Sequence, residues 1–83
     1  MVASNQIVLA PNTEGILVDN SAGTRVINVA FKPFDNIHVG ATGVTTQNGF
    51  KIDRFNTEQL KIAVGDILYG YSIEGTIVHV LTT

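Results

Sequence analysis

The feature that most constrains this chain is a series of short β-branched runs, each ended within a few residues by glycine, proline, asparagine or aspartate. Isoleucine, valine and threonine together supply 28 of the 83 residues. β-Branched side chains favour strands and disfavour helices, and short strands separated by closely spaced turns are typical of all-β domains. We therefore predict one all-β domain over residues 1–83, a small β-sandwich or barrel of about eight strands.

Turn residues divide the chain into the strands that we expect. Asn48-Gly49 is a pair that favours tight hairpins, because both residues tolerate positive φ, so residues 44–52 are expected to form a hairpin with Gly49 in the left-handed region. Residues 56–61 could begin a helix with an asparagine cap, but the apolar alternation over residues 60–64 fits a strand better. The expected strands are residues 6–10, 15–18, 24–31, 37–39, 44–46, 50–52, 60–64, 67–73 and 76–81.

Alternation along the last expected strand gives it two apolar faces. Ile77, His79 and Leu81 share one face, and Val78 and Val80 share the other, because successive strand side chains point to opposite sides.

The composition excludes several classes of protein. The chain has no cysteine, which rules out a disulfide scaffold and a cysteine-based zinc module. No apolar run approaches the roughly 18 residues of a membrane span, and residues 1–6 lack the basic and apolar regions of a signal peptide. Five basic residues against seven acidic ones give a net charge of −2, which argues against a nucleic-acid partner. We predict neither a nucleic-acid nor a membrane partner.

The charge content points to an assembly. Charged residues are 14% of the chain and hydrophobic residues 45%, whereas soluble domains carry about 25% charged residues. A domain this small buries only about 60–65% of its unfolded surface, so much apolar surface stays outside, and large apolar patches mark partner-facing surfaces. We predict a homo-oligomer, with a homotrimer as the expected form. The alternative is a monomer whose neutral surface is made of Thr, Asn, Gln and Ser.

The sequence offers no convincing catalytic or metal-binding motif. Residues 40–46 have the glycine spacing of a phosphate loop but lack its lysine and helix. His38 and His79 have no third ligand at metal-site spacing, and the serines lie outside any nucleophile-elbow motif. The aspartates next to turns are explained by Asx-turns and caps. We predict that the chain is not an enzyme and uses no cofactor and no metal.

The aromatic residues are the remaining candidates for a binding surface. Tyr69 and Tyr71 are two apart and so share one strand face, where they could form a sugar-stacking or partner-binding platform. The alternative is a core edge whose hydroxyl groups reach solvent. Phe34 and Phe55 belong to a phenylalanine group in the middle of the chain.

Residues 37–52, IHVGATGVTTQNGFKI, contain an Ile-x-Val-Gly strand end, a Val-Thr after a small-residue turn, and a glycine before apolar residues. Residues 59–62, 67–69 and 75–81 follow as an alternating strand, a tyrosine-containing strand and a Gly-Thr that opens a valine-rich strand. In these motifs and their order, the second half of the chain, residues 36–83, resembles small structural proteins of tailed bacteriophages. Residues 56–58 depart from the family's pattern, with Asn-Thr-Glu where the family often has Pro-Gly.

The resemblance implies a virion structural protein, and the expected role is a capsid decoration (cement) protein that stabilises the assembled head. It implies a location on the outer capsid surface, with a major capsid protein as partner. The alternative is a receptor- or glycan-binding module of a phage fibre or tail.

We expect residues 1–9 to serve as an inter-subunit arm or strand that pairs with a neighbour by β-augmentation. The resemblance places the turn at Asn48 at the tip of the module, where a partner could be met. The candidate interface residues are Val2, Ile7, Leu9, Phe34, Asn48, Phe55, Tyr69 and Tyr71.

Overall fold

The computed structural model describes residues 3–83 as an all-β sandwich. Its eight strands are β1 (Ala3–Leu9), β2 (Thr13–Asp19), β3 (Ile27–Pro33), β4 (Ile37–Gly40), β5 (Phe50–Ile52), β6 (Glu58–Ile62), β7 (Ile67–Ser72) and β8 (Thr76–Thr82). The predicted fold class is confirmed, and the sandwich is the form that the chain adopts. Residues 3–83 contain no helix that could span a membrane.

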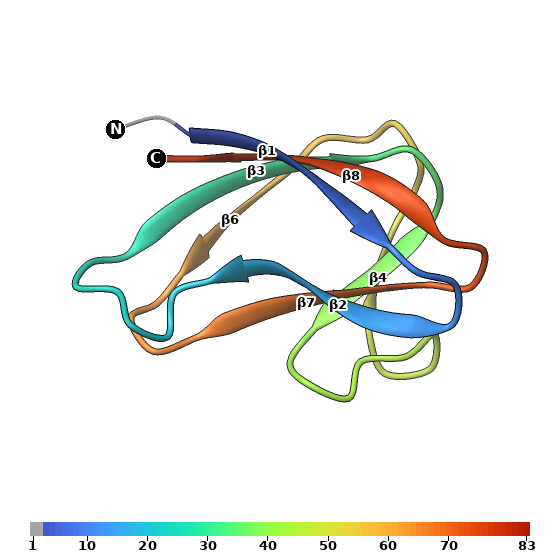
Figure 1. The fold of residues 1–83 in the computed structure, drawn as a ribbon, viewed down its shortest axis with the longest axis horizontal. Coiled ribbons are helices and arrows are strands. Elements are labelled where there is room, and N and C mark those ends of the chain that lie inside the picture. Colours follow the sequence, from blue (N-terminus) through green and yellow to red (C-terminus); the bar gives the residue numbers. More distant parts are fainter. Residues whose placement is uncertain (1–2) are drawn as a thin grey trace.

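Two four-stranded antiparallel sheets form the two layers (Figure 1). Sheet A has the strand order β1-β8-β3-β6, and sheet B has the order β2-β7-β4-β5. Residues opposite each other in an antiparallel pair point to the same side, so the registers decide which residues meet between the sheets. Phe31 lies opposite Val80, and Val39 lies opposite Gly70, with both pairs directed inward.

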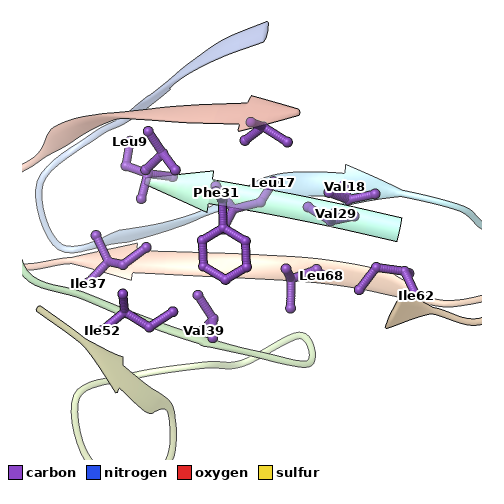
Figure 2. Packing of buried hydrophobic residues seen from close by; sticks show 12 residues of the cluster. Leu9, Leu17, Val18, Val29, Phe31, Ile37, Val39, Ile52, Ile62 and Leu68 are labelled. Carbon is purple, nitrogen blue, oxygen red and sulfur yellow. The ribbon is translucent and has the colours of Figure 1, made fainter. Parts of the chain in front are cut away.

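The core lies between the sheets and is built from one face of almost every strand. Phe31, Ile37 and Val78 are almost completely buried at its centre. Figure 2 shows the Phe31 ring between the aliphatic side chains that both sheets contribute. β2 adds two successive residues, Leu17 and Val18, because a register shift between Ile16 and Val18 turns both inward. Burial of this apolar surface is the main stabilising contribution.

The first predicted strand has a partner in its own chain. β1 pairs with β8 without interruption, from Ala3 opposite Thr82 to Leu9 opposite Thr76. Residues 3–9 therefore form an edge strand of the domain and do not need a neighbouring subunit to be ordered. The edge of β1 that faces away from β8 is the part available to such a neighbour. Val2, the first residue of the candidate interface, lies outside the described residues.

The predicted hairpin at Asn48-Gly49 is wrong. Residues 44–46 form no strand, and β5 pairs with β4 across a nine-residue loop, residues 41–49. The Gly49 N–H donates to the Thr45 carbonyl oxygen at 3.0 Å, and Gly49 is not among the residues with positive φ, whereas Gly43 has a φ of 85°. Long-range contacts of this loop replace the local turn that the sequence pair favours.

Two smaller differences concern strand ends. β3 begins at Ile27, three residues later than expected, because the Arg25 carbonyl accepts a hydrogen bond from Asn20 in the preceding loop. β6 covers Glu58–Ile62, so residues 56–61 form no helix, but the strand begins and ends two residues earlier than the expected 60–64.

Candidate functional site

The outward face of sheet A is apolar along its middle strand. β8 directs Val78 and Val80 into the core and leaves Ile77, His79 and Leu81 on the opposite side. Val8 of β1 lies directly opposite Ile77 and has the largest exposure of any large hydrophobic residue in the described chain, at 75%. We call this surface the open face; its residues are Ser4, Gln6, Val8, Asn28, Ala30, Lys32, Gln59, Lys61, Ile77, His79 and Leu81.

The open face is also positively charged relative to the rest of the molecule. It carries Lys32 and Lys61, which are two of the chain's five basic residues, while all seven carboxylates lie elsewhere. The net charge of −2 thus divides into +2 on the open face and three basic minus seven acidic residues, or −4, on the remaining surface. A partner that matches this face is apolar and carries acidic groups.

An aromatic cluster extends the open face beyond the end of β3. The Phe34 ring stacks on His79 with 4.6 Å between ring centroids, and it contacts the Phe55 ring at 5.8 Å. The Phe55 N–H donates to the Pro33 carbonyl oxygen at 2.8 Å, which fixes the turn that carries the second ring. Both phenylalanines are exposed, so this part of the predicted interface is assembled at the surface.

The backbone of Phe55 is strained. Its φ is 63°, a left-handed conformation that bulky residues rarely adopt. Such conformations cost on the order of 1–3 kcal/mol and concentrate at functional sites. This backbone conformation places the exposed Phe55 ring beside Phe34, where the ring contributes little to the core.

Two shallow hollows lie side by side on the open face. Their volumes are about 370 and 490 Å³, and both are lined by Ala30 and Leu81. The first extends toward β1 and is bordered by Gln6, and the second extends toward β6 and is bordered by Gln59. The small side chain of Ala30 lets the surface dip at the centre of the sheet, which suits a broad protein contact better than a deep ligand pocket.

Part of the opposite side of the molecule is occupied by a loop of the chain itself. The loop 41–49, in lime green in Figure 1, lies against the outer side of sheet B. The Glu14 carboxylate accepts hydrogen bonds from the Gly43 N–H at 2.6 Å and from the Thr42 hydroxyl at 3.2 Å. Val44 is buried beneath the loop beside Gly40. Part of the outer side of sheet B is thus occupied by the loop, while Ile16, opposite Tyr69, stays exposed there.

Tyr69 and Tyr71 share the outer side of sheet B, as the alternation predicts, because Leu68 and Ser72 point into the core. Both tyrosines are half-buried. The Tyr71 hydroxyl lies 3.3 Å from the Asn12 Oδ1 atom, to which it donates, and Tyr71 is opposite His38. The two rings are on the side of the molecule away from the open face, so the predicted interface residues divide between two surfaces.

Three other predicted interface residues have structural roles. Leu9 is 2% exposed and belongs to the core, so it is not available to a partner; the strand's alternation turns it inward. Ile7 is half-buried and packs against the same core. The Asn48 side chain accepts from the Thr45 N–H at 2.7 Å and donates to the Gly43 carbonyl at 3.2 Å, so it holds the loop 41–49 in shape.

The side chain of Asp19 is engaged in a turn. The Asp19 carboxylate accepts from the Ser21 hydroxyl at 2.5 Å and from the Ser21 N–H at 2.9 Å. These hydrogen bonds, the hydroxyl first, lower the pKa of Asp19 below its ordinary value. This is the Asx-turn that the sequence predicts. Among residues 3–83 no group of three or more His, Asp or Glu side chains is gathered closely enough to hold a metal ion.

Sequence reasoning did not select Val8, Ile77 and Leu81 as interface residues. The signal was present, because the last strand is apolar on both faces and a sheet in a two-layer sandwich can bury only one. Neither a protein-family model, nor a curated protein, nor a solved structure matches this chain.

Proposed function

We propose that this chain is a structural protein of the tailed-bacteriophage virion, a capsid decoration protein that attaches to the shell through its open face. The resemblance of residues 36–83 to small phage structural proteins suggests the setting. The observation that carries the proposal is the open face itself, where Ile77 and Leu81 of β8 and Val8 of β1 are exposed beside two lysines.

The chemistry of the open face indicates what it binds. Ile77 and Leu81 would lose water on contact, with a gain of about 25 cal/mol for each Å² of apolar surface removed. Lys32 and Lys61 would meet carboxylates and exclude basic surfaces. The proposed partner is therefore a protein surface that is apolar and acidic, supplied by the major capsid protein of the assembled head.

The proposed mechanism is thermodynamic and involves no catalysis or cofactor. A protein that binds the assembled shell in preference to its free subunits stabilises the shell by mass action. Many modest contacts become strong when linked copies engage several capsid subunits at once.

The alternative, a receptor- or glycan-binding module, would use the side of sheet B that carries Tyr69 and Tyr71. The Tyr71 hydroxyl and the Glu14 carboxylate are both engaged within the chain. Fewer polar groups remain there to orient a sugar, and we therefore favour the capsid contact.

The copy number per phage particle tests whether this chain is a decoration protein of the virion. Quantitative mass spectrometry of purified virions should find this chain in numbers comparable with those of the major capsid protein. A few copies per particle would place it in the tail, the neck or a fibre and contradict the decoration role, and its absence from the virion would contradict the proposal as a whole.

Two matched isoleucine substitutions test the face. Ile77→Glu puts a carboxylate in the middle of the open face, whereas Ile73→Glu puts one beside His38 and Lys51 on the other side of the molecule. Both positions are exposed, so both variants should fold. Ile77→Glu should weaken binding to purified shells on the order of tenfold or more, as at the centre of an interface, while Ile73→Glu should bind like the parent. Equal binding by the two variants would remove the open face from the contact.

A further inference from the structure

The edge of β1 differs from the other three sheet edges in having no protection against pairing. Edge strands present unpaired backbone N–H and C=O groups, and proteins block them with charged residues, proline, bulges or short strands. β1 spans Ala3–Leu9 with the sequence ASNQIVL and contains no charged residue and no proline. Its register with β8 is continuous. In residues 3–83, β8 is the single strand that pairs with β1.

Each of the other edges carries at least one blocking feature. β2 has a register shift between Ile16 and Val18 and contains two charged residues, Glu14 and Asp19. β5 is three residues long and includes Lys51. β6 has five residues, and two of them, Glu58 and Lys61, are charged. The sequence thus protects three edges and leaves the longest uninterrupted one open.

We propose that β1 is a self-association strand, which pairs antiparallel with the β1 strand of a second copy of this chain about a two-fold axis. Complete overlap of the two seven-residue strands places Gln6 opposite Gln6 of the second copy, with Ser4 opposite Val8 and Asn5 opposite Ile7. The backbone groups on the free edge then gain hydrogen-bond partners, and the highly exposed Val8 side chain lies beside the second copy.

The absence of charge on β1 favours a second copy of this chain as the occupant. In a two-fold pair each strand meets its own sequence, so a charged strand would set like charges near each other. β1 has no charges, and its self-pairing carries no such penalty. A closed ring of three would require β1 to pair with a different edge of its neighbour, and the bulged, short or charged edges are poor partners for a seven-residue strand. The geometry therefore favours a dimer over the homotrimer expected from composition.

Two-fold pairing through β1 would join two copies of sheet A into one eight-stranded sheet. The two open faces would then lie on the same side of that sheet. This inference does not depend on the phage setting, because its tests use the purified protein without any capsid.

Two matched glutamine substitutions test the pairing. Gln6 is in the middle of β1, and Gln59 is on β6 at the opposite edge; both are exposed on the open face. The chain has no cysteine of its own, so single Gln6→Cys and Gln59→Cys variants report one site each. Directly opposed strand residues come close enough for a disulfide. Mild oxidation at micromolar concentration should convert Gln6→Cys to a covalent dimer much faster than Gln59→Cys.

Light scattering after size-exclusion chromatography supplies the second readout. The parent protein should have twice the 8.9 kDa mass of one chain. Gln6→Lys places two ammonium groups opposite each other at the two-fold axis, so this variant should have the mass of a monomer. Gln59→Lys should keep the mass of the dimer. A parent of 8.9 kDa at all concentrations, a trimeric mass, or equal cross-linking at the two positions would overturn the proposal.

Discussion

At the residue scale, one buried amide connects three segments of the sandwich. Asn20 is 2% exposed, and its side-chain N–H groups lie 3.0–3.1 Å from three carbonyl oxygens, shared between two donors. The Asn20 carbonyl in turn accepts from the N–H groups of two glycines. The carbonyls belong to Arg25, Ile62 and Ala63, and the glycines are Gly23 and Gly65. This residue therefore fixes the end of the sandwich where β2, β3, β6 and β7 meet.

Asn20→Ala should destabilise the fold by about 2–4 kcal/mol, because it leaves buried carbonyl groups without donors. Asn36→Ala is the matched control, since Asn36 is exposed and its side chain accepts one hydrogen bond, from the Arg54 N–H; about 0.5–1 kcal/mol is expected there. Urea unfolding of both variants checks the difference. Equal losses would mean that the Asn20 amide does not hold the three segments together.

The sequence predicts the chemistry of this turn but not the burial of Asn20. Asp19 and Asn20 stand in one turn-rich cluster, and the Asx-turn at Asp19 follows from local preference. The partners of Asn20 at the end of β6, Ile62 and Ala63, are 42 and 43 residues away. No local pattern distinguishes the exposed aspartate from the buried asparagine, because burial depends on where β6 ends in the folded sandwich.

At the element scale, the loop 41–49 illustrates how a long-range contact overrides a local signal. Asn48-Gly49 favours a two-residue hairpin turn, yet the loop closes through a Gly49 N–H to Thr45 carbonyl hydrogen bond. Residues 44–46, which were expected to form a strand, instead lie in the loop, and the Val44 side chain is buried beside Gly40 and Gly49. Glycine is required at position 49 because of close packing and not because of its φ.

Gly49→Ala should destabilise the fold by about 1–3 kcal/mol, the usual cost of overpacking. An added Cβ atom would lie 2.6 Å from the Val44 Cγ2 atom, 2.7 Å from the His38 Cβ atom and 2.9 Å from the Thr45 carbonyl oxygen. Thermal melting of the variant and the parent checks the loss. Identical melting temperatures would contradict the packing described for this loop.

Gly43→Ala separates the steric cause from a backbone cause. Gly43 has a φ of 85° and nothing within 4 Å of an added Cβ atom, so its loss should be near 1 kcal/mol from backbone strain alone. Val44→Ala removes the methyl group that an alanine at position 49 would meet, so the double variant should lose less stability than the two single losses added together. The stability lost in Gly43→Ala should not be recovered by Val44→Ala, because no side chain lies near an added Cβ atom there.

At the scale of the whole molecule, the fold class could be predicted from the sequence, whereas the apolar open face of sheet A could not. Short β-branched runs between closely spaced turns predict an all-β domain. Alternation does not predict which face is buried, because β7 turns Leu68 inward and leaves Tyr69 and Tyr71 on the outer side. The loop 41–49 occupies part of the outer side of sheet B, where Glu14 holds it. That contact joins segments far apart in the sequence, so the pattern within single strands does not reveal it.

The three lysines of the chain are divided between the outer sides of the two sheets. Lys32 and Lys61 lie on the open face, whereas Lys51 lies opposite His38 on the outer side of sheet B, near Asp53 at 3.8 Å. These three are all the lysines of the chain. Their reactivity toward an amine-modifying reagent, read by mass spectrometry, therefore compares the two surfaces within one protein.

Lysine labelling of shell-bound protein against free protein tests the central claim, that sheet A provides the partner-binding surface. Binding to purified capsid shells should protect Lys32 and Lys61 from modification and leave Lys51 as reactive as in the free chain. Protection of Lys51 with unchanged labelling of Lys32 and Lys61 would contradict the account and place the contact on sheet B.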